Sequence, residues 1–147
     1  MEHGLLLAEF FALPFDIAVP DVLYAVELEP YFDHLAAQGL LVLGLRADTI
    51  RYVDGLSGRG ERLPSINDRL ALGLAHQEAC MLLTGDQDLR RLAETDGIEV
   101  HGTIWVLERI LDEGQVQIDD IEQCFDRMVA AGSRLPREKF KAMLARR

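Results

Sequence analysis

The chain has 147 residues, of which 49% are hydrophobic and 27% are charged. These proportions fit one compact domain with a core of ordinary size and exclude a disordered chain. No apolar run approaches the roughly 20 residues that a membrane-spanning helix needs, so we expect no association with a membrane. The N-terminus lacks the basic start and the long apolar run of a secretory leader, which favours a cytoplasmic protein.

The formal net charge is −10 at neutral pH. Proteins that bind nucleic acid through their overall positive charge need an excess of Lys and Arg, which this chain lacks. A polyanion would therefore have to bind at a local group of basic residues. Residues 133–147 have the opposite balance, with six basic residues and one acidic residue. Such a tail can serve a phosphate backbone or an acidic partner, but cations at the end of a terminal helix also complement its dipole. The tail alone does not decide between these functions.

The pattern of apolar residues predicts helices and strands that alternate along the chain. Strands are expected over residues 15–19, 40–45, 80–83 and 98–100, and the strand over 40–45 is apolar enough for burial on both faces. Helices are expected over residues 5–13, 22–29, 31–38, 47–53 and 103–111, after Ser65, after Asp86, and twice after Ile118. This order favours an α/β fold with a mostly parallel sheet, as a single domain over residues 1–147 whose last part, about 118–147, is a helical extension.

Two features of the chain are given structural interpretations. Cys80 and Cys124 lack a Cys-x-x-Cys spacing, and we expect both to be buried, inert thiols. A glycine-rich stretch after residue 54 carries Arg59 and Arg62. Because it follows a helical pattern and contains no Lys, we interpret it as a loop and not as a phosphate-binding turn.

Acidic residues stand at two neighbouring strand-to-helix junctions. Asp86 follows the strand that ends at Leu83, with Thr84 beside it, and Asp68 lies in the first turn of the preceding helix, three residues after Ser65. Ligands bind beyond the carboxyl ends of strands in open parallel sheets. If the two carboxylates converge, they suit a hard divalent cation such as Mg²⁺ or Mn²⁺, which can activate water to hydrolyse a phosphodiester.

Each of these acids also has a purely structural explanation. Ser65 and Asp68 fit a helix-capping arrangement, and Asp86 can complement a helix dipole. An acidic residue near a helix start occurs at both junctions, Thr84 lies beside the second one, and the helix after Val19 offers a further acid. Together these features favour the functional interpretation. Arg69 and Arg90 are the nearest basic residues, and we expect them at exposed helix positions, paired with nearby acids.

The residues from Ser65-x-x-Asp68 through Thr84-x-Asp86 to Gly102-Thr103 resemble the second half of a PIN domain. The resemblance is to bacterial VapC-type and VapC-like members. It implies a three-layer α/β/α fold and an endoribonuclease that depends on Mg²⁺ or Mn²⁺, often the toxin of a toxin–antitoxin pair. It further implies RNA as the substrate, a small antitoxin protein as a partner, and a homodimer.

The resemblance also assigns the site residues. Asp68 and Asp86 match the third and fourth acidic positions of the family, both as metal-binding carboxylates, and Thr84 matches the hydroxyl residue that accompanies the fourth. Glu27, followed by Leu28, best fits the second position. The expected catalytic and metal-binding residues are therefore Glu27, Asp68 and Asp86, supported by Ser65 and Thr84.

One part of the family pattern is missing from the sequence. PIN domains begin with a central strand that ends in an Asp, whereas this chain starts where the first helix of the family would start. We expect either an upstream start or the loss of that strand, which would leave strand edges that another chain can fill. The alternative to an active nuclease is therefore an inactive or N-terminally truncated PIN-like module that binds a protein or RNA.

Overall fold

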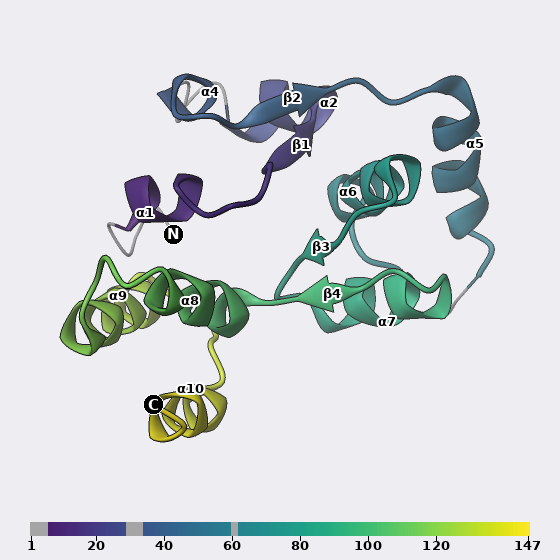
Figure 1. Ribbon diagram of the computed structural model, residues 1–147. Helices are drawn as coiled ribbons and strands as arrows, with labels where there is room; N and C mark the ends of the chain where they lie inside the picture. The colour runs from purple at the N-terminus through teal and green to yellow at the C-terminus, as the bar shows by residue number, and fades with distance from the viewer. Residues whose placement is uncertain (1–5, 29–33, 60–61) are drawn as a thin grey trace. The chain divides into compact units, whose positions relative to one another are not determined.

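The computed structural model describes residues 6–28, 34–59 and 62–147 (Figure 1). The chain divides into two compact units, one over residues 16–101 and one that combines residues 1–15 with 102–147. The expectations that concerned Leu5, Glu29, the start of the helix at Tyr31, and Gly60 lie outside the described residues. A single domain over residues 1–147 stays a prediction.

The unit over residues 16–101 alternates strands and helices, as the sequence predicts. Its elements are β1 (Ala18–Pro20), α2 (Asp21–Leu23) continuing into the π-helical η1 (Tyr24–Leu28), α4 (His34–Ala37), β2 (Leu41–Leu43), α5 (Ala47–Leu56), α6 (Ile66–Glu78), β3 (Leu82–Leu83), α7 (Gln87–Thr95) and β4 (Val100–His101).

All strand pairing among the described residues is parallel, which confirms the expected type of sheet. β1 pairs with β2, Ala18 opposite Leu41, and β3 pairs with β4, Leu82 opposite Val100. The described strands form two separate two-stranded sheets and not one continuous sheet. Helix α6 contacts both β1 and β3, so one helix supports both sheets. The fold is thus a mixed α/β fold with short parallel strands, and the three-layer arrangement remains a prediction.

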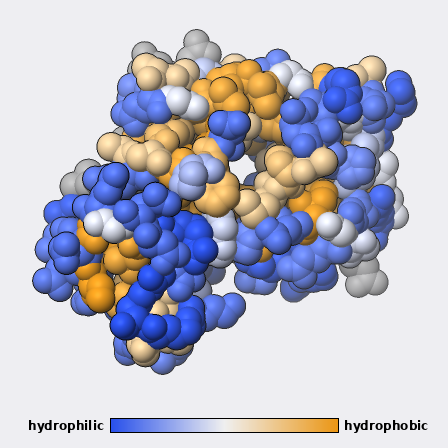
Figure 2. Space-filling model, viewed as in Figure 1, coloured by the Kyte–Doolittle hydropathy of each residue, from blue (hydrophilic) through white to orange (hydrophobic). Residues whose placement is uncertain are grey.

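The expectation that residues 40–45 are buried on both faces is wrong. Leu41 is 41% exposed and Val42 is 38% exposed, and hydrophobic surface lies over β2 in Figure 2. A strand is buried on both faces only when layers cover both faces of its sheet. Among the described residues β2 pairs only with β1, and the sequence of a strand cannot reveal how many neighbours it has.

The core of this unit forms where α5 and α6 pack closely together. Leu56 and Leu72 are completely buried, with Leu89 and Ala93 of α7 beside them in the same cluster. Gly73 permits the close approach, because a Cβ atom there would lie 2.6 Å from Cγ2 of Val53. Helix α6 thus packs through Leu72 and Gly73, and its polar residues do not take part in this core.

Cys80 corrects a second expectation. Helix α6 ends at Ala79, which has a left-handed backbone (φ 53°), and the strand begins only at Leu82. Cys80 therefore lies in the connection, where it is exposed, while Cys124 is buried as expected. The predicted strand began two residues too early because the turn at Ala79 has no Gly or Asn to mark it.

The second unit is helical. It contains α1 (Leu7–Phe11), α8 (Thr103–Asp112), α9 (Ile118–Ala130) and α10 (Arg137–Ala145), around a core in which Phe125 stacks on Phe140 with ring centroids 4.1 Å apart. Leu107 of α8 belongs to this core, and Ile104, Trp105 and Leu111 are partly buried and pack against it. No helix of the described residues is long and apolar enough to cross a membrane.

The basic C-terminal residues have partners within this unit. Arg147 pairs with Asp112 at 2.5 Å and with Glu108 at 3.4 Å, and Arg146 also reaches Glu108 at 3.4 Å. These ion pairs connect the end of α10 to α8. The charges at the very end of the tail thus have a structural role as ion-pair partners of α8, which differs from the expected interaction with the helix dipole.

Candidate functional site

Asp68 lies in the first turn of α6, on a cap that forms as the sequence predicts. The Ser65 hydroxyl oxygen accepts a hydrogen bond from the Asp68 backbone amide at 3.2 Å. This bond satisfies one of the amides that have no partner within the helix. The cap fixes the backbone of Asp68 and places its half-buried carboxylate at the N-terminal end of α6.

Asp86 is the N-cap residue of α7, directly after the β3 strand. Its Oδ1 accepts a hydrogen bond from the Leu89 backbone amide at 2.8 Å, and the Thr84 hydroxyl accepts one from the Asp86 amide at 3.1 Å. Both side chains predicted at this junction therefore form local backbone contacts. The other carboxylate oxygen of Asp86 has no hydrogen-bond partner among the described residues, and the residue is exposed.

Glu27 is held near α6 by a residue that the sequence analysis missed. The Asn67 side-chain amide donates a hydrogen bond to Oε1 of Glu27, across forty positions of sequence. Asn67 lies between Ser65 and Asp68 in the first turn of α6, so the turn that carries one acid also orients another. The sequence contained no sign of this role beyond its position within the Ser65-x-x-Asp68 motif.

The pKa of Asp68 is raised, and two neighbouring carboxylates contribute to the rise. Burial raises the pKa of this carboxyl most, a hydrogen bond from Ser65 opposes the rise, and the negative charges of Asp86 and Glu27 raise it further. A nearby like charge disfavours the ionised form of a carboxyl group. Glu27 of η1 and Asp86 at the start of α7 therefore both lie within electrostatic range of Asp68.

The donor set fits a hard divalent cation, because all three residues offer carboxylate oxygens. Mutual repulsion at Asp68 is the condition that a bound cation would relieve. The described residues contain no group of three or more His, Cys, Asp or Glu side chains arranged closely enough to hold a metal ion together. Their charges fit a cation, and to bind one together the three side chains would have to come closer to one another than they lie here.

The two arginines nearest in sequence to the acids differ from each other. Arg90 donates to the Val100 carbonyl at 3.4 Å and pairs with Glu94 at 3.6 Å, in agreement with the structural interpretation. Arg69 is half-buried, and its Nε has no hydrogen-bond partner among the described residues. The expected exposed ion pair of Arg69 is thus not present in that part of the chain.

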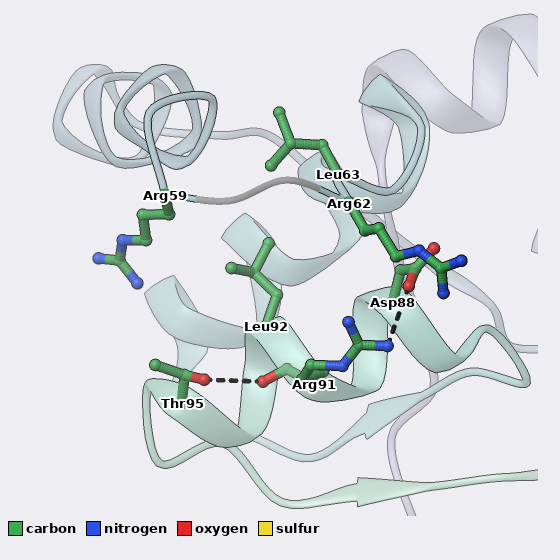
Figure 3. A pocket seen from close by; sticks show the side chains of 7 residues that line it. All are labelled: Arg59, Arg62, Leu63, Asp88, Arg91, Leu92 and Thr95. Atoms are coloured by element: carbon green, nitrogen blue, oxygen red, sulfur yellow. Dashed lines mark hydrogen bonds and ion pairs between the residues drawn. The ribbon is translucent and has the colours of Figure 1, made fainter.

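A pocket of about 460 Å³ lies between the end of the α5–α6 connection and α7. Arginines from both segments line it, Arg59 and Arg62 from the connection and Arg91 from α7, together with Asp88, Leu63 and Leu92 (Figure 3). The sequence pattern around Arg59 and Arg62 predicts a loop and no phosphate-binding role for either residue. Their approach to Arg91 depends on tertiary structure that no local pattern encodes.

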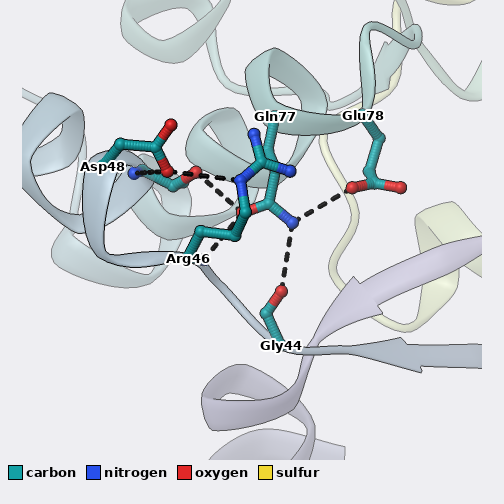
Figure 4. Close-up of polar contacts among 6 residues, drawn as sticks. Gly44, Arg46, Asp48, Gln77 and Glu78 are labelled. Atoms are coloured by element: carbon teal, nitrogen blue, oxygen red, sulfur yellow. Dashed lines mark hydrogen bonds and ion pairs between the residues drawn. The ribbon is translucent and has the colours of Figure 1, made fainter.

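The opposite end of α6 is fixed by Gln77 (Figure 4). Its side-chain oxygen accepts hydrogen bonds from the Arg46 amide at 2.9 Å and from the Thr49 hydroxyl at 2.7 Å, and its nitrogen donates to the Gly44 carbonyl at 3.1 Å. One side chain thereby connects α6 to the residues that join β2 and α5. The helix that carries Asp68 is held against the rest of the unit by polar contacts as well as by its apolar face.

Comparison with known proteins gives one match. A family model named DUF3368 and described as a PIN domain matches residues 65–147, which is more than half of the chain. The chain belongs to the PIN-domain family. No curated protein and no solved structure matches it.

PIN domains are usually nucleases and generally use divalent metal ions, which gives the acidic residues a chemical context. The matched region begins at the Ser65 cap and includes Asp68 and Asp86, but not Glu27. The family predicted from the sequence is therefore confirmed. The assignment to VapC-type members stays a prediction.

Proposed function

We propose that this PIN domain is an endoribonuclease that hydrolyses RNA phosphodiesters with a Mg²⁺ or Mn²⁺ ion held by Glu27, Asp68 and Asp86. The observation that supports it is the negative charge gathered around Asp68, because the pKa of this carboxyl is raised most by burial and further by the charges of Asp86 and Glu27. Such repulsion costs free energy unless a cation is bound, and it has no structural benefit.

The protein contributes orientation to this site. The Leu89 amide fixes one oxygen of Asp86, and Asn67 fixes one oxygen of Glu27. The second oxygen of each carboxylate has no hydrogen-bond partner among the described residues and is available to a ligand. Ser65 fixes the backbone of Asp68 through the cap of α6. These contacts supply the outer support that keeps ligating carboxylates in position.

A bound divalent ion would activate water and neutralise the charge that develops on the phosphate. The three acidic side chains would hold it, and the substrate would be placed by groups outside the acidic site. Thr84 has a structural role in this site. Its hydroxyl oxygen accepts a hydrogen bond from the Asp86 amide and thereby stabilises the turn that positions Asp86.

Calorimetric titration of the full chain with Mn²⁺ tests the metal site. We expect saturable binding that is lost in Asp86→Asn, with parallel loss of cleavage of a single-stranded RNA. The matched control is Asp54→Asn, because Asp54 is an exposed acid of α5 in the same unit. The control should retain both binding and cleavage, since it removes the same charge away from the site.

Two results would contradict this proposal. Equal Mn²⁺ affinity in Asp86→Asn and the native chain would show that Asp86 is only a helix cap. Metal binding that persists without any RNA cleavage over a range of substrates would show that the site is not a nuclease centre.

A second candidate function is a module that binds a protein through a strand. It is favoured by the two separate sheets, and by the exposure of Val42 in β2 and Leu83 in β3, at 38% and 41%. Strand edges with apolar residues are templates for pairing with another chain. The occupant would be a second copy, giving a homodimer, or the small antitoxin protein that a toxin role implies.

Sedimentation equilibrium distinguishes these occupants. A homodimer should dissociate in Val42→Lys and persist in Ile118→Lys, which alters an equally exposed residue of the other unit. A chain that is monomeric at all concentrations excludes the homodimer. Co-purification with the product of a small neighbouring reading frame would then support an antitoxin, and its absence would leave the nuclease acting alone.

A further inference from the structure

The pocket between the α5–α6 connection and α7 is basic, although the whole chain carries a net charge of −10. Of the residues that the structure describes, three arginines line it, Arg59, Arg62 and Arg91, together with one acid, Asp88. The composition of an acidic protein does not predict that basic side chains from two segments will line one pocket. They indicate a local preference for an anion.

The three arginines are not equally engaged. Arg59 pairs with Asp96 and lies over the Tyr52 ring, 5.8 Å from its centroid, and Tyr52 also donates to the same Asp96 carboxylate. Arg91 pairs with Asp88 at 3.1 Å, an exposed i,i+3 pair of small energetic value. Arg62 is exposed and has no hydrogen-bond or ion-pair partner among the described residues. Arg59 is therefore positioned by the fold, while Arg62 and Arg91 are available to a ligand.

The remaining lining suits a nucleotide. Leu63 and Leu92 provide an apolar surface on which a sugar or a base can rest, and the volume of about 460 Å³ lies within the range of small-molecule sites. The guanidinium group presents its donors in a fixed fork that matches phosphate oxygens. Pockets with two or three arginines beside an apolar wall thus combine phosphate contact with base contact.

The pocket is continuous along the chain with the acidic site. Arg62 and Leu63 lead directly into the Ser65 cap of α6, and Asp88 follows Asp86 by two residues in α7. From Asp88 to Thr95 the pocket follows α7 over seven residue steps, which correspond to about 10 Å at 1.5 Å per residue. A strand bound in the pocket would therefore extend along α7 from the end that carries Asp86.

We propose that Arg62 and Arg91, with Arg59 held beside them, bind the backbone phosphates of a single-stranded RNA and form a substrate subsite next to the acidic residues. The identity of the ligand as RNA rests on the proposed nuclease function, whereas binding to phosphate does not. Contacts to phosphate position a nucleic acid without reading its sequence, so the subsite fixes where the strand enters.

Binding is measured without metal, by fluorescence anisotropy of a labelled single-stranded RNA of about ten nucleotides in EDTA. Cleavage does not enter this measurement, so failure of the nuclease proposal and failure of this one remain distinguishable. Arg62→Ala should weaken binding roughly tenfold and reduce the slope of log K against log salt by about 0.7. Arg51→Ala is the matched control, because Arg51 is an exposed arginine of α5 that is not part of the pocket lining.

Asp88→Asn provides a test in the opposite direction. Removing this carboxylate releases Arg91 from its ion pair and takes a negative charge away from the pocket. RNA binding should therefore become tighter, by roughly threefold to tenfold, and an unfolded variant cannot produce such a gain. Asp54→Asn makes the same change in net charge outside the pocket and should have little effect.

Two further probes identify the source of the phosphate. Inorganic phosphate at millimolar concentration should compete weakly with the RNA, and the same oligonucleotide with and without a 5′-phosphate should bind equally. A requirement for the 5′-phosphate would overturn the backbone assignment in favour of a terminal phosphate. Unchanged affinity in both Arg62→Ala and Asp88→Asn would overturn the subsite.

Discussion

Asp68 lies in the first turn of α6 and Asp86 caps α7, yet the charge of Asp86 reaches the Asp68 carboxyl. Burial raises the pKa of Asp68 most, and the negative charge of Asp86 raises it further, while each residue also takes part in a helix cap. The structural and the functional explanations of these acids are therefore compatible. A cap fixes the backbone of a carboxylate, and a fixed carboxylate is what a metal site requires.

The first prediction separates the two roles of Asp86. Asn is as good an N-cap as Asp, so Asp86→Asn should keep the bond to the Leu89 amide and lose only the repulsion with Asp68. Its free energy of unfolding in urea should be unchanged or slightly higher. Asp86→Ala removes the cap as well and should cost about 1 kcal/mol. Equal destabilisation by both substitutions would show that the charge itself stabilises the fold.

The second prediction concerns the contact of α5 with α6. A Cβ atom at Gly73 would lie 2.6 Å from Cγ2 of Val53 and 3.2 Å from Cγ2 of Thr49. Gly73→Ala should therefore destabilise the protein by about 1–3 kcal/mol through overpacking, despite the better helix propensity of Ala. Gly55→Ala in α5 is the control, since a Cβ atom there meets nothing within 4 Å and should not destabilise the helix.

A double substitution tests the cause of that loss. Val53 is almost fully buried, so Val53→Ala alone should leave a cavity and lower stability. In Gly73→Ala combined with Val53→Ala, the added methyl occupies part of the space that is vacated. The combined loss should be smaller than the sum of the single losses, and strict additivity would mean that the two residues do not compete for space.

The features that the sequence predicted are local ones. The caps at Ser65 and Asp86 follow from residue types within three positions of the helix starts. The alternation of strands and helices over residues 16–101 likewise follows from the spacing of apolar residues. Such features depend on the chain itself and on its nearest neighbours, so a pattern is enough to predict them.

The features that the sequence did not predict depend on neighbours far away in the chain. Asn67 forms a hydrogen bond with Glu27, and Arg62 and Arg91 line the same pocket. No sequence periodicity relates the positions in either pair. The exposure of β2 depends on how many strands flank it, not on the apolar run of Leu41 to Leu43. Features that depend on such distant neighbours are the ones that a sequence pattern does not predict.

The third prediction concerns the polar contacts of Gln77. Gln77→Ala removes the acceptor for the Arg46 amide and for the hydroxyl of the buried Thr49, and the donor to the Gly44 carbonyl. A buried donor left without a partner costs about 1–3 kcal/mol, so a loss of that size is expected in urea unfolding. Gln38→Ala, the same substitution at an exposed position outside these contacts, should change stability by less than about 0.5 kcal/mol. A neutral Gln77→Ala would mean that water replaces these contacts.

The last prediction is a pH dependence that originates at Asp96. Burial raises the pKa of this carboxyl, but hydrogen bonds from Tyr52 and Arg59 and the charges of Arg59 and His76 outweigh burial, so the net pKa is lowered. A carboxyl with a lowered pKa in the folded state stabilises the fold above its unfolded pKa of about 3.9. This stabilisation is lost as the pH falls from there through the folded pKa. In Asp96→Asn the free energy of unfolding should be lower at pH 7 and should fall less steeply below pH 4 than in the native chain. Parallel pH profiles of the two proteins would show that other carboxylates govern acid unfolding.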